Sequence, residues 1–444
     1  MNIHLSSHFT YPRLLRFVLP SVVMMIFTSI YSVVDGLFVS NFVGKAPFTA
    51  LNLIYPLLGI LGTLGFMIGT GGSALVSKTL GEGEPEKANR IFSLLIYVTI
   101  AAGLALTVLG LIFIEPVAVL MGAEGEILTD CVLYGRILLL SLTAFMLQNV
   151  FQSFLITAER PHLGLAVTVG AGVTNIILDA LMVAVFRWGL AGAAVASALS
   201  QVAGGLVPLI YFLHPKNDSP LRLVRARFDG RALWQTCTNG SSELMSNMSI
   251  SLVNMLYNLQ LIAVAGADGV AAYGVLMYVN FVFLAIFIGY AIGSAPIVSF
   301  HYGAGNWDEV KNLFGKSLVI IAVSGVAMTV LAELLAGPLS SVFVGYDEAL
   351  YAMTVHGFRL YALSFLMAGF NIFGSAFFTA LNDGAVSAAI SFLRTLVFQV
   401  AAVWILPIFL ELDGVWLSIV AAETLALLVT GGFLLGKRKV YHYL

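Results

Sequence analysis

Long apolar runs alternate with short polar connections along the chain. A membrane-spanning helix needs roughly 20 consecutive, mostly apolar residues, and about twelve runs reach that length. The pattern therefore predicts an all-α polytopic membrane protein with twelve transmembrane helices. We place these helices near residues 14–38, 47–76, 92–114, 132–157, 163–186, 190–213, 235–264, 270–299, 316–336, 350–380, 385–409 and 414–436.

Composition and charge support the membrane assignment and add an orientation. Hydrophobic residues make up 59% of the chain and charged residues 10%, with a mean hydropathy of +0.97, whereas average proteins carry about 25% charged residues. Lys and Arg gather in both termini and in every second loop, and the other loops are acidic. Because basic loops stay in the cytoplasm, we expect a multi-pass protein of the cell (inner) membrane with cytoplasmic N- and C-termini. The net charge of −2 predicts no nucleic-acid partner.

The chain repeats itself at an offset of 222 residues, half its length. Six spans per repeat give both halves the same orientation, and transporters built from such parallel repeats bind substrate between them. We therefore expect two pseudo-symmetric six-helix bundles: an N-terminal lobe (1–213), a basic cytoplasmic linker (214–233) and a C-terminal lobe (234–444). The matches include Gly81 with Gly303, Gly83 with Gly305, Pro116 with Pro338, Asn149 with Asn371, and Thr157 with Thr379.

Two carboxylates lie inside apolar runs of the first half. Asp35 is the lone charge between Phe17 and Val43, and Asp179 follows Asn175 by four residues, on the same helix face. A charge at the bilayer centre costs about 3 kcal/mol on insertion scales, so such groups commonly face a cavity or a partner. With the hydroxyl of Ser197, they form a set of hard oxygen ligands suited to a proton or Na⁺.

We therefore predict an ion-coupling site in the first lobe. Its members are Asp35, Asn175, Asp179 and Ser197, and the first three would hold Na⁺ if the ion is Na⁺. The alternative is that these groups are hydrogen-bonded only to support helix packing, as membrane polar residues often are.

The second half has aromatic and small residues where the first half has acids. Under the 222-residue offset, Asp35 falls on Tyr257 and Asp179 on Ala401. Methionines adapt to different ligands and aromatic faces attract cations, so spans seven and eight suit a promiscuous pocket for organic cations; the alternative is a lipid-facing or packing surface. The candidate substrate-binding residues are Asn149, Glu243, Met255, Tyr257, Met277, Tyr278 and Asn280. Arg394 and Glu423 are further intramembrane charges, and their role stays open.

Several stretches resemble the multidrug and toxic compound extrusion (MATE) family. They are Ile30–Val39 (IYSVVDGLFV), Ser77–Gly83 (SKTLGEG), Asn175–Asp179 (NIILD) and Leu412–Leu417 (LDGVWL). Within that family the chain is most similar to the bacterial MepA-type branch. The resemblance implies two six-helix bundles around a central cleft, and the same first-lobe ion residues, Asp35, Asn175, Asp179 and Ser197.

Taken with the resemblance, these features predict a cation-coupled multidrug efflux antiporter that exports organic, drug-like cations by alternating access. The coupling ion would be H⁺ or Na⁺, with no other cofactor; membrane lipids would surround a monomer, and no enzyme activity is expected. The alternative is a lipid-linked oligosaccharide flippase of the same superfamily. That function needs a basic cleft, for which the candidates are Arg136, Arg359 and Arg394.

Overall fold

The chain folds into helices throughout the part that the structure describes. The computed structural model describes residues 3–43, 45–214 and 217–444, and the side chains of 32–33, 35–41, 45–46, 48 and 52 lie outside the described residues. No strand occurs within those ranges, so the all-α prediction is confirmed. The elements are α1 (Tyr11–Phe42), α2 (Lys45–Gly81), α3 (Pro85–Leu120), α4 (Gly125–Thr157), α5 (Pro161–Asp179), η1 (Ala180–Val185), α6 (Gly189–Leu213), α7 (Gly230–Gly303), α8 (Trp307–Val344), α9 (Glu348–Ala362), α10 (Phe365–Ala380), α11 (Gly384–Phe392), η2 (Leu393–Phe398) and α12 (Gln399–Tyr441).

The described helices account for the twelve expected crossings. Nine of these helical segments are long and apolar enough to cross a membrane. The helix pair α9 and α10, bent by 47°, makes a tenth such segment. Two of the ten are hairpins. The α7 helix contains a non-helical residue at Gly266, with φ 65°, and α12 contains one at Glu411, with φ 48°. Each hairpin holds two spans, so the ten segments contain twelve crossings.

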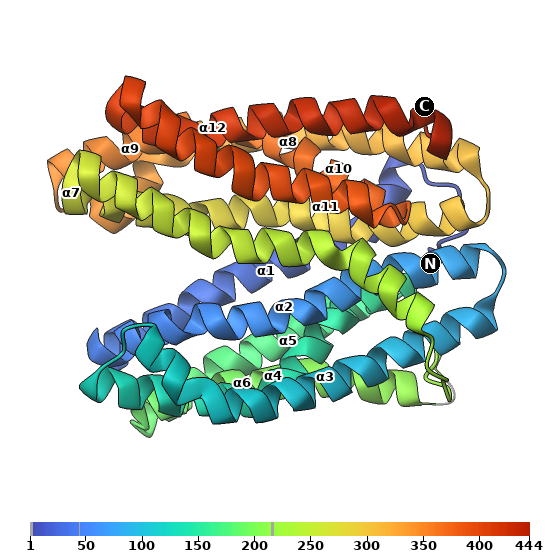
Figure 1. The fold of residues 1–444 in the computed structure, drawn as a ribbon, viewed down its shortest axis with the longest axis horizontal. Helices are drawn as coiled ribbons and strands as arrows, with labels where there is room; N and C mark the ends of the chain where they lie inside the picture. Colours follow the sequence, from blue (N-terminus) through green and yellow to red (C-terminus); the bar gives the residue numbers. More distant parts are fainter. Residues whose placement is uncertain (1–2, 44, 215–216) are drawn as a thin grey trace.

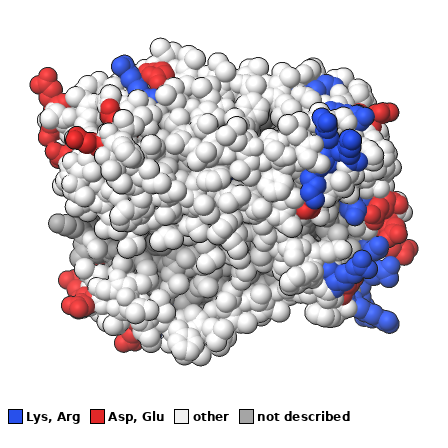
Figure 2. Space-filling view, turned by 45° about the horizontal axis from the view of Figure 1, so that its top comes forward, with Lys and Arg blue, Asp and Glu red and all other residues white. Residues whose placement is uncertain are grey.

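The helices form two groups that lie side by side. Figure 1 shows α1–α6 in the lower half of the view and α7–α12 in the upper half, with both chain termini at the right-hand end. Lys and Arg gather at that same end in Figure 2, as the distribution of basic loops predicts. The lobe boundaries at 213 and 234, and the cytoplasmic side of the termini, stay predictions.

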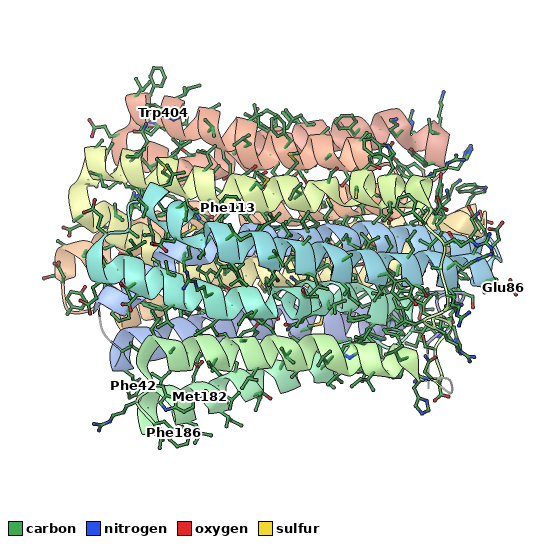
Figure 3. All side chains as sticks on the ribbon, turned by 60° about the horizontal axis from the view of Figure 1, so that its bottom comes forward. Phe42, Glu86, Phe113, Met182, Phe186 and Trp404 are labelled. Atoms are coloured by element: carbon green, nitrogen blue, oxygen red, sulfur yellow. The ribbon has the colours of Figure 1, made fainter. Side chains whose placement is uncertain are left out.

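The outer surface is apolar, as a protein surrounded by lipid requires. Phe113 on α3 is 54% exposed and Trp404 on α12 is 52% exposed, and Trp404 lies at the upper edge of the bundle in Figure 3. Further exposed side chains on α8, such as Val323 and Leu334, are also apolar. An apolar surface of this extent would be thermodynamically unfavourable if it were exposed to water.

Glycines bring the two groups into backbone contact near the termini. A Cβ built at Gly81 on α2 would lie 2.0 Å from the Phe300 carbonyl oxygen, and one at Gly303 on α7 would lie 2.1 Å from that of Lys78. Near the start of α7, a Cβ at Gly240 would lie 2.0 Å from the Met67 carbonyl oxygen. The groups are therefore tightly closed against each other at the end that carries both termini.

Two non-helical segments lie at the same end. The N-terminal arm, residues 3–10, reaches both: His4 Nδ1 lies 2.6 Å from Glu159 Oε2, and His8 Nδ1 lies 2.6 Å from Glu309 Oε2. The connection before α7 runs along α3 instead, where the Arg222 amide donates to Asn89 Oδ1 at 2.6 Å. It ends at Asp229, whose side chain caps α7.

Candidate functional site

The predicted first-lobe site is buried and polar. Asn175 is 2% exposed and Asp179 is 0% exposed, one turn apart on α5. The Asn175 amide donates from Nδ2 to Ser197 Oγ on α6 at 3.3 Å. Its other side-chain atom, Oδ1, has no hydrogen-bond partner among the described residues. The structure thus brings three predicted residues onto two neighbouring helices, with a buried oxygen able to accept a further bond.

A change of helix geometry occurs at Asp179. The α-helix α5 ends there, and the six-residue π-helical segment η1 begins at Ala180. Such wide turns are uncommon and occur frequently at functional sites. Asp179 is therefore the last α-helical residue before a wider turn.

The helix that carries Asp35 lies beside α5. Gly172 of α5 faces α1: a Cβ there would lie 2.4 Å from the Phe27 ring and 3.1 Å from the Tyr31 ring. Gly164, earlier on α5, faces Met24, earlier on α1, so the two helices run in the same direction. The Asp35 side chain lies outside the described residues, and its membership of the site stays a prediction.

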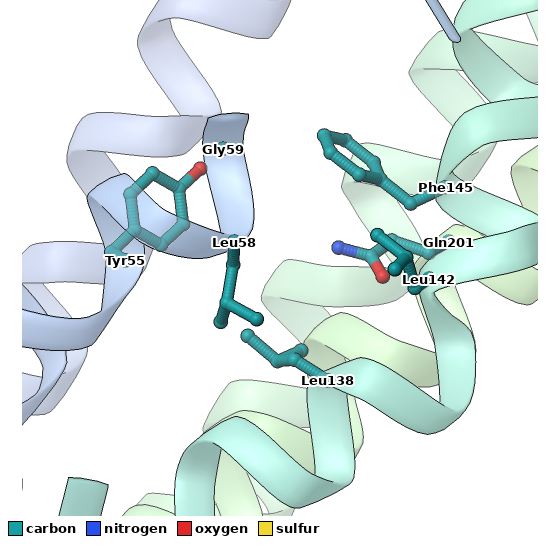
Figure 4. Close-up of a pocket in the computed structure, with 7 residues that line it drawn as sticks. All are labelled: Tyr55, Leu58, Gly59, Leu138, Leu142, Phe145 and Gln201. Atoms are coloured by element: carbon teal, nitrogen blue, oxygen red, sulfur yellow. The ribbon is translucent and has the colours of Figure 1, made fainter. Parts of the chain in front are cut away.

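A small, mostly apolar pocket with one amide side chain occurs on the same face of α6 as Ser197. It is lined by Tyr55, Leu58 and Gly59 of α2, Leu138, Leu142 and Phe145 of α4, and Gln201 of α6 (Figure 4). Gln201 accepts a hydrogen bond from Ser141 at 2.7 Å. The pocket has a volume of about 30 Å³, which suffices for a water molecule. Sites for drug-sized ligands have volumes of roughly 300–1,000 Å³. This pocket was not predicted from the sequence, although Gln201 follows Ser197 by four residues.

The predicted substrate residues are distributed between core and surface. Tyr257 is 2% exposed and its ring stacks on that of Tyr273, with centroids 5.0 Å apart. Met255 is 59% exposed, and Tyr278, 47% exposed, stacks on Phe343. The remaining four are buried or half-buried: Asn149, Glu243, Met277 and Asn280. Their role in substrate binding stays a prediction.

The second lobe contains a buried ion pair whose partners the sequence could not assign. Arg394 lies in η2 and Glu423 on α12, with Nη2 of the arginine 2.8 Å from Oε1 of the glutamate. Asn371 on α10 donates to the same carboxylate at 2.7 Å. The available signal was a pair of opposite charges in neighbouring spans. Among the described residues, no cluster of three His, Cys, Asp or Glu side chains has the arrangement of a metal site.

The comparisons with known proteins agree with this architecture. The family model named MatE matches residues 20–181 and again residues 244–405, one match in each half. The chain belongs to the MatE family. The two matches also account for the internal repeat, and the predicted family is confirmed.

Relatives and solved structures of the MatE family align along nearly the whole chain. Multidrug export protein MepA of Staphylococcus aureus is 24% identical over 422 residues, covering 94% of this chain and 92% of the relative. MepA of Staphylococcus saprophyticus is 23% identical over 416 residues, covering 94% and 91%. A structure described as MATE in complex with MaL6 has a TM-score of 0.91 at 24% identity, covering 97% and 96%. An outward-facing multidrug resistance MATE family transporter of the MOP superfamily has a TM-score of 0.90 at 23% identity, with the same coverage.

Proposed function

We propose that this MatE-family protein is a multidrug antiporter that exports drug-like organic cations in exchange for H⁺ or Na⁺. The observation that carries the proposal is the buried pair of Asn175 and Asp179, with the half-buried Ser197 beside them. It places a carboxylate, an amide and a hydroxyl inside spans that are otherwise apolar. The curated relatives named multidrug export protein support the substrate class.

The proposed exchange depends on a second carboxylate from α1. Because α1 and α5 run in the same direction and touch at Tyr31 and Gly172, the next turn of α1 carries the backbone of Asp35 to the level of Asn175. Two acids that share one buried site raise each other's affinity for a proton or a cation. Occupation of the site would favour one packing of α1 and α5, and release would favour another.

The closed end of the molecule fits one state of an alternating-access cycle. The lobes touch through Gly81 and Gly303 at the end with both termini. If the termini are cytoplasmic, as proposed, this state is closed toward the cytoplasm. Ion and substrate would then exchange on the opposite side of the membrane.

Transport in reconstituted vesicles tests the proposal. A fluorescent organic cation should move against its gradient when either a pH gradient or a Na⁺ gradient is imposed, and Asp179→Asn should abolish that movement. Ser197→Ala should weaken it, whereas the matched control Ser200→Ala should not, because Ser200 donates to the Ala171 carbonyl at 2.8 Å and serves helix packing. Transport that is unaffected by either gradient would contradict ion coupling.

The flippase alternative gains no support from the arginines it requires. Arg394 is paired with Glu423, and Arg359 Nε lies 3.8 Å from Glu333 Oε2. Arg136 is exposed on α4. Arginines already engaged with carboxylates have less charge to offer a pyrophosphate.

A further inference from the structure

The Arg394–Glu423 pair in the second lobe has no part in the proposed exchange, yet it is buried. The Glu423 side chain is 2% exposed and that of Arg394 is 14% exposed. Nε of Arg394 donates to both carboxylate oxygens, at 2.9 and 3.0 Å. Nη2 adds a third contact at 2.8 Å to Oε1. This is a multidentate charge-assisted contact of the kind that only Arg supplies.

An amide completes the set of bonds to the carboxylate. Asn371 Nδ2 donates to Glu423 Oε2 at 2.7 Å and to its backbone carbonyl at 2.9 Å. Asn371 Oδ1 in turn accepts from Thr430 at 3.0 Å, which fixes the orientation of the amide. Each carboxylate oxygen therefore has two donor contacts for its roughly two lone-pair sites, and the single Nε hydrogen is shared between the two oxygens. The carboxylate offers no further position for a proton or a metal cation.

The charges around Glu423 balance without an added ion. Four groups face it from four elements: Arg394 from η2, the neutral Asn371 from α10, and the phenols of Tyr361 on α9 and Tyr257 on α7. Tyrosines ordinarily stay neutral near pH 7, and Arg stays charged. The one positive charge of the cluster thus compensates its one negative charge.

We infer that Arg394 is a resident counter-ion of Glu423, so that the second lobe neither takes up nor releases a coupling ion. In the first lobe, an exchanged cation would neutralise Asp179; in the second lobe, the protein's own guanidinium neutralises Glu423. Arg394 is therefore a positioning residue that restricts ion exchange to one lobe. This inference concerns a different lobe from the proposed coupling site and holds for either ion.

Removal of the counter-ion should create an ion site. In Arg394→Gln, the buried carboxylate of Glu423 loses its partner, and a lone buried charge is strongly disfavoured. It should then bind a proton or, at higher pH, Na⁺. In Arg394→Gln/Glu423→Gln, both charges are absent, so the cluster should again bind neither a proton nor Na⁺.

Proton uptake by the purified full chain tests the inference without any transport. Potentiometric titration in detergent from pH 8 to pH 5 should give the same number of protons for wild type and for Arg394→Gln/Glu423→Gln. Arg394→Gln should take up one more proton per molecule, or bind one more Na⁺ in a ²²Na⁺ binding assay at pH 8. Both gains should be absent from the double variant.

Two results would overturn the inference. One is a wild type that takes up one proton more than the double variant, because Glu423 would then already titrate beside Arg394. The other is a folded Arg394→Gln that matches the double variant in both assays. If Arg394→Gln does not fold, the comparison of wild type with the charge-neutral double variant decides alone. A failure of ion-driven transport would contradict the proposed function. It would not affect the numbers of protons and Na⁺ ions bound per molecule, on which this inference depends.

Discussion

Gly81 and Gly303 are repeat-related positions, 222 residues apart, and each lies against the backbone of the other's helix. Gly81 faces the Phe300 carbonyl, and Gly303 faces the Lys78 carbonyl. The contact is thus nearly symmetric between the two halves. Only glycine leaves room for two helix backbones at this distance, so the closed end of the molecule depends on the absence of two Cβ atoms.

Gly81→Ala should therefore open the end that carries the termini. The new methyl group would lie 2.0 Å from a backbone oxygen, so the lobes must move apart. Spin labels at the exposed, repeat-related positions Glu86 and Asp308 should report a longer distance between the lobes. Gly315→Ala on α8 is the matched control, because a Cβ there meets nothing within 4 Å. Equal distance distributions in the two variants would show that this contact does not hold the lobes closed.

Asp35→Asn and Asp179→Asn should each stop ion-driven transport while the protein still folds. The amide keeps the size of the carboxyl group and removes its charge. We expect a fall in coupled rate of more than about tenfold, which corresponds to 1.4 kcal/mol. The readout is transport under an imposed ion gradient, with thermal unfolding as the control for folding.

The double variant distinguishes one shared site from two separate sites. If Asp35 and Asp179 act together, the transport rate of Asp35→Asn/Asp179→Asn should be little lower than that of either single variant. The reason is that the effects of substitutions within one coupled site are not additive. If the loss of transport in the double variant, expressed as a free energy, equals the sum of the losses in the two single variants, the two acids belong to independent sites.

The two stacked tyrosines of α7 should respond differently to loss of their hydroxyl groups. Tyr273 donates to Asn254 Oδ1 at 3.0 Å, whereas the buried Tyr257 hydroxyl has no hydrogen-bond partner among the described residues. Tyr273→Phe should cost about 1 kcal/mol of unfolding free energy, and Tyr257→Phe should be neutral or stabilising. Thermal unfolding of the two variants side by side measures the difference. A larger loss in Tyr257→Phe would show that its hydroxyl binds a partner, as a substrate-site role would require.

Apolar length and local chemistry were sufficient to predict the crossings. Each span exceeds the bilayer thickness, and Gly266 lies at a hairpin that the sequence placed between spans seven and eight. The hairpin at Glu411 was likewise expected from the acidic loop around it. These features are local, so a single sequence contains them.

Contacts that depend on register between helices could not be predicted. Arg394 and Glu423 are 29 residues apart, and only the chain reversal at Glu411 brings them together. The sequence also gave no sign of the π-helical turns η1 and η2, because these depend on how neighbouring helices pack. Asn175 and Ser197 were predicted to share a site because both are polar residues inside apolar spans and because the family resemblance places ion residues there.

The N-terminal arm supports a further prediction, because it binds both lobes through carboxylates that differ in burial. Glu309 on α8 has a side chain 7% exposed; it accepts from the Phe9 amide at 2.8 Å and from Asn312 at 2.8 Å, and lies 2.6 Å from His8 Nδ1. Glu159 in the first lobe is 18% exposed, lies 2.6 Å from His4 Nδ1 and accepts from the Leu5 amide at 2.7 Å. The arm therefore has a firmer attachment to the second lobe than to the first.

Glu309→Ala should release the arm more fully than Glu159→Ala. A hydrogen bond to a charged group contributes about 1.5–3 kcal/mol, and the Phe9 amide would remain buried without its acceptor. Hydrogen exchange of the peptide covering residues 5–10 should accelerate strongly in Glu309→Ala and weakly in Glu159→Ala. The arm connects the lobes at their closed end, so Glu309→Ala should also lengthen the distance between labels at Glu86 and Asp308. Faster exchange without any change in that distance would show that the arm lies on a closed interface that the glycine contacts maintain by themselves.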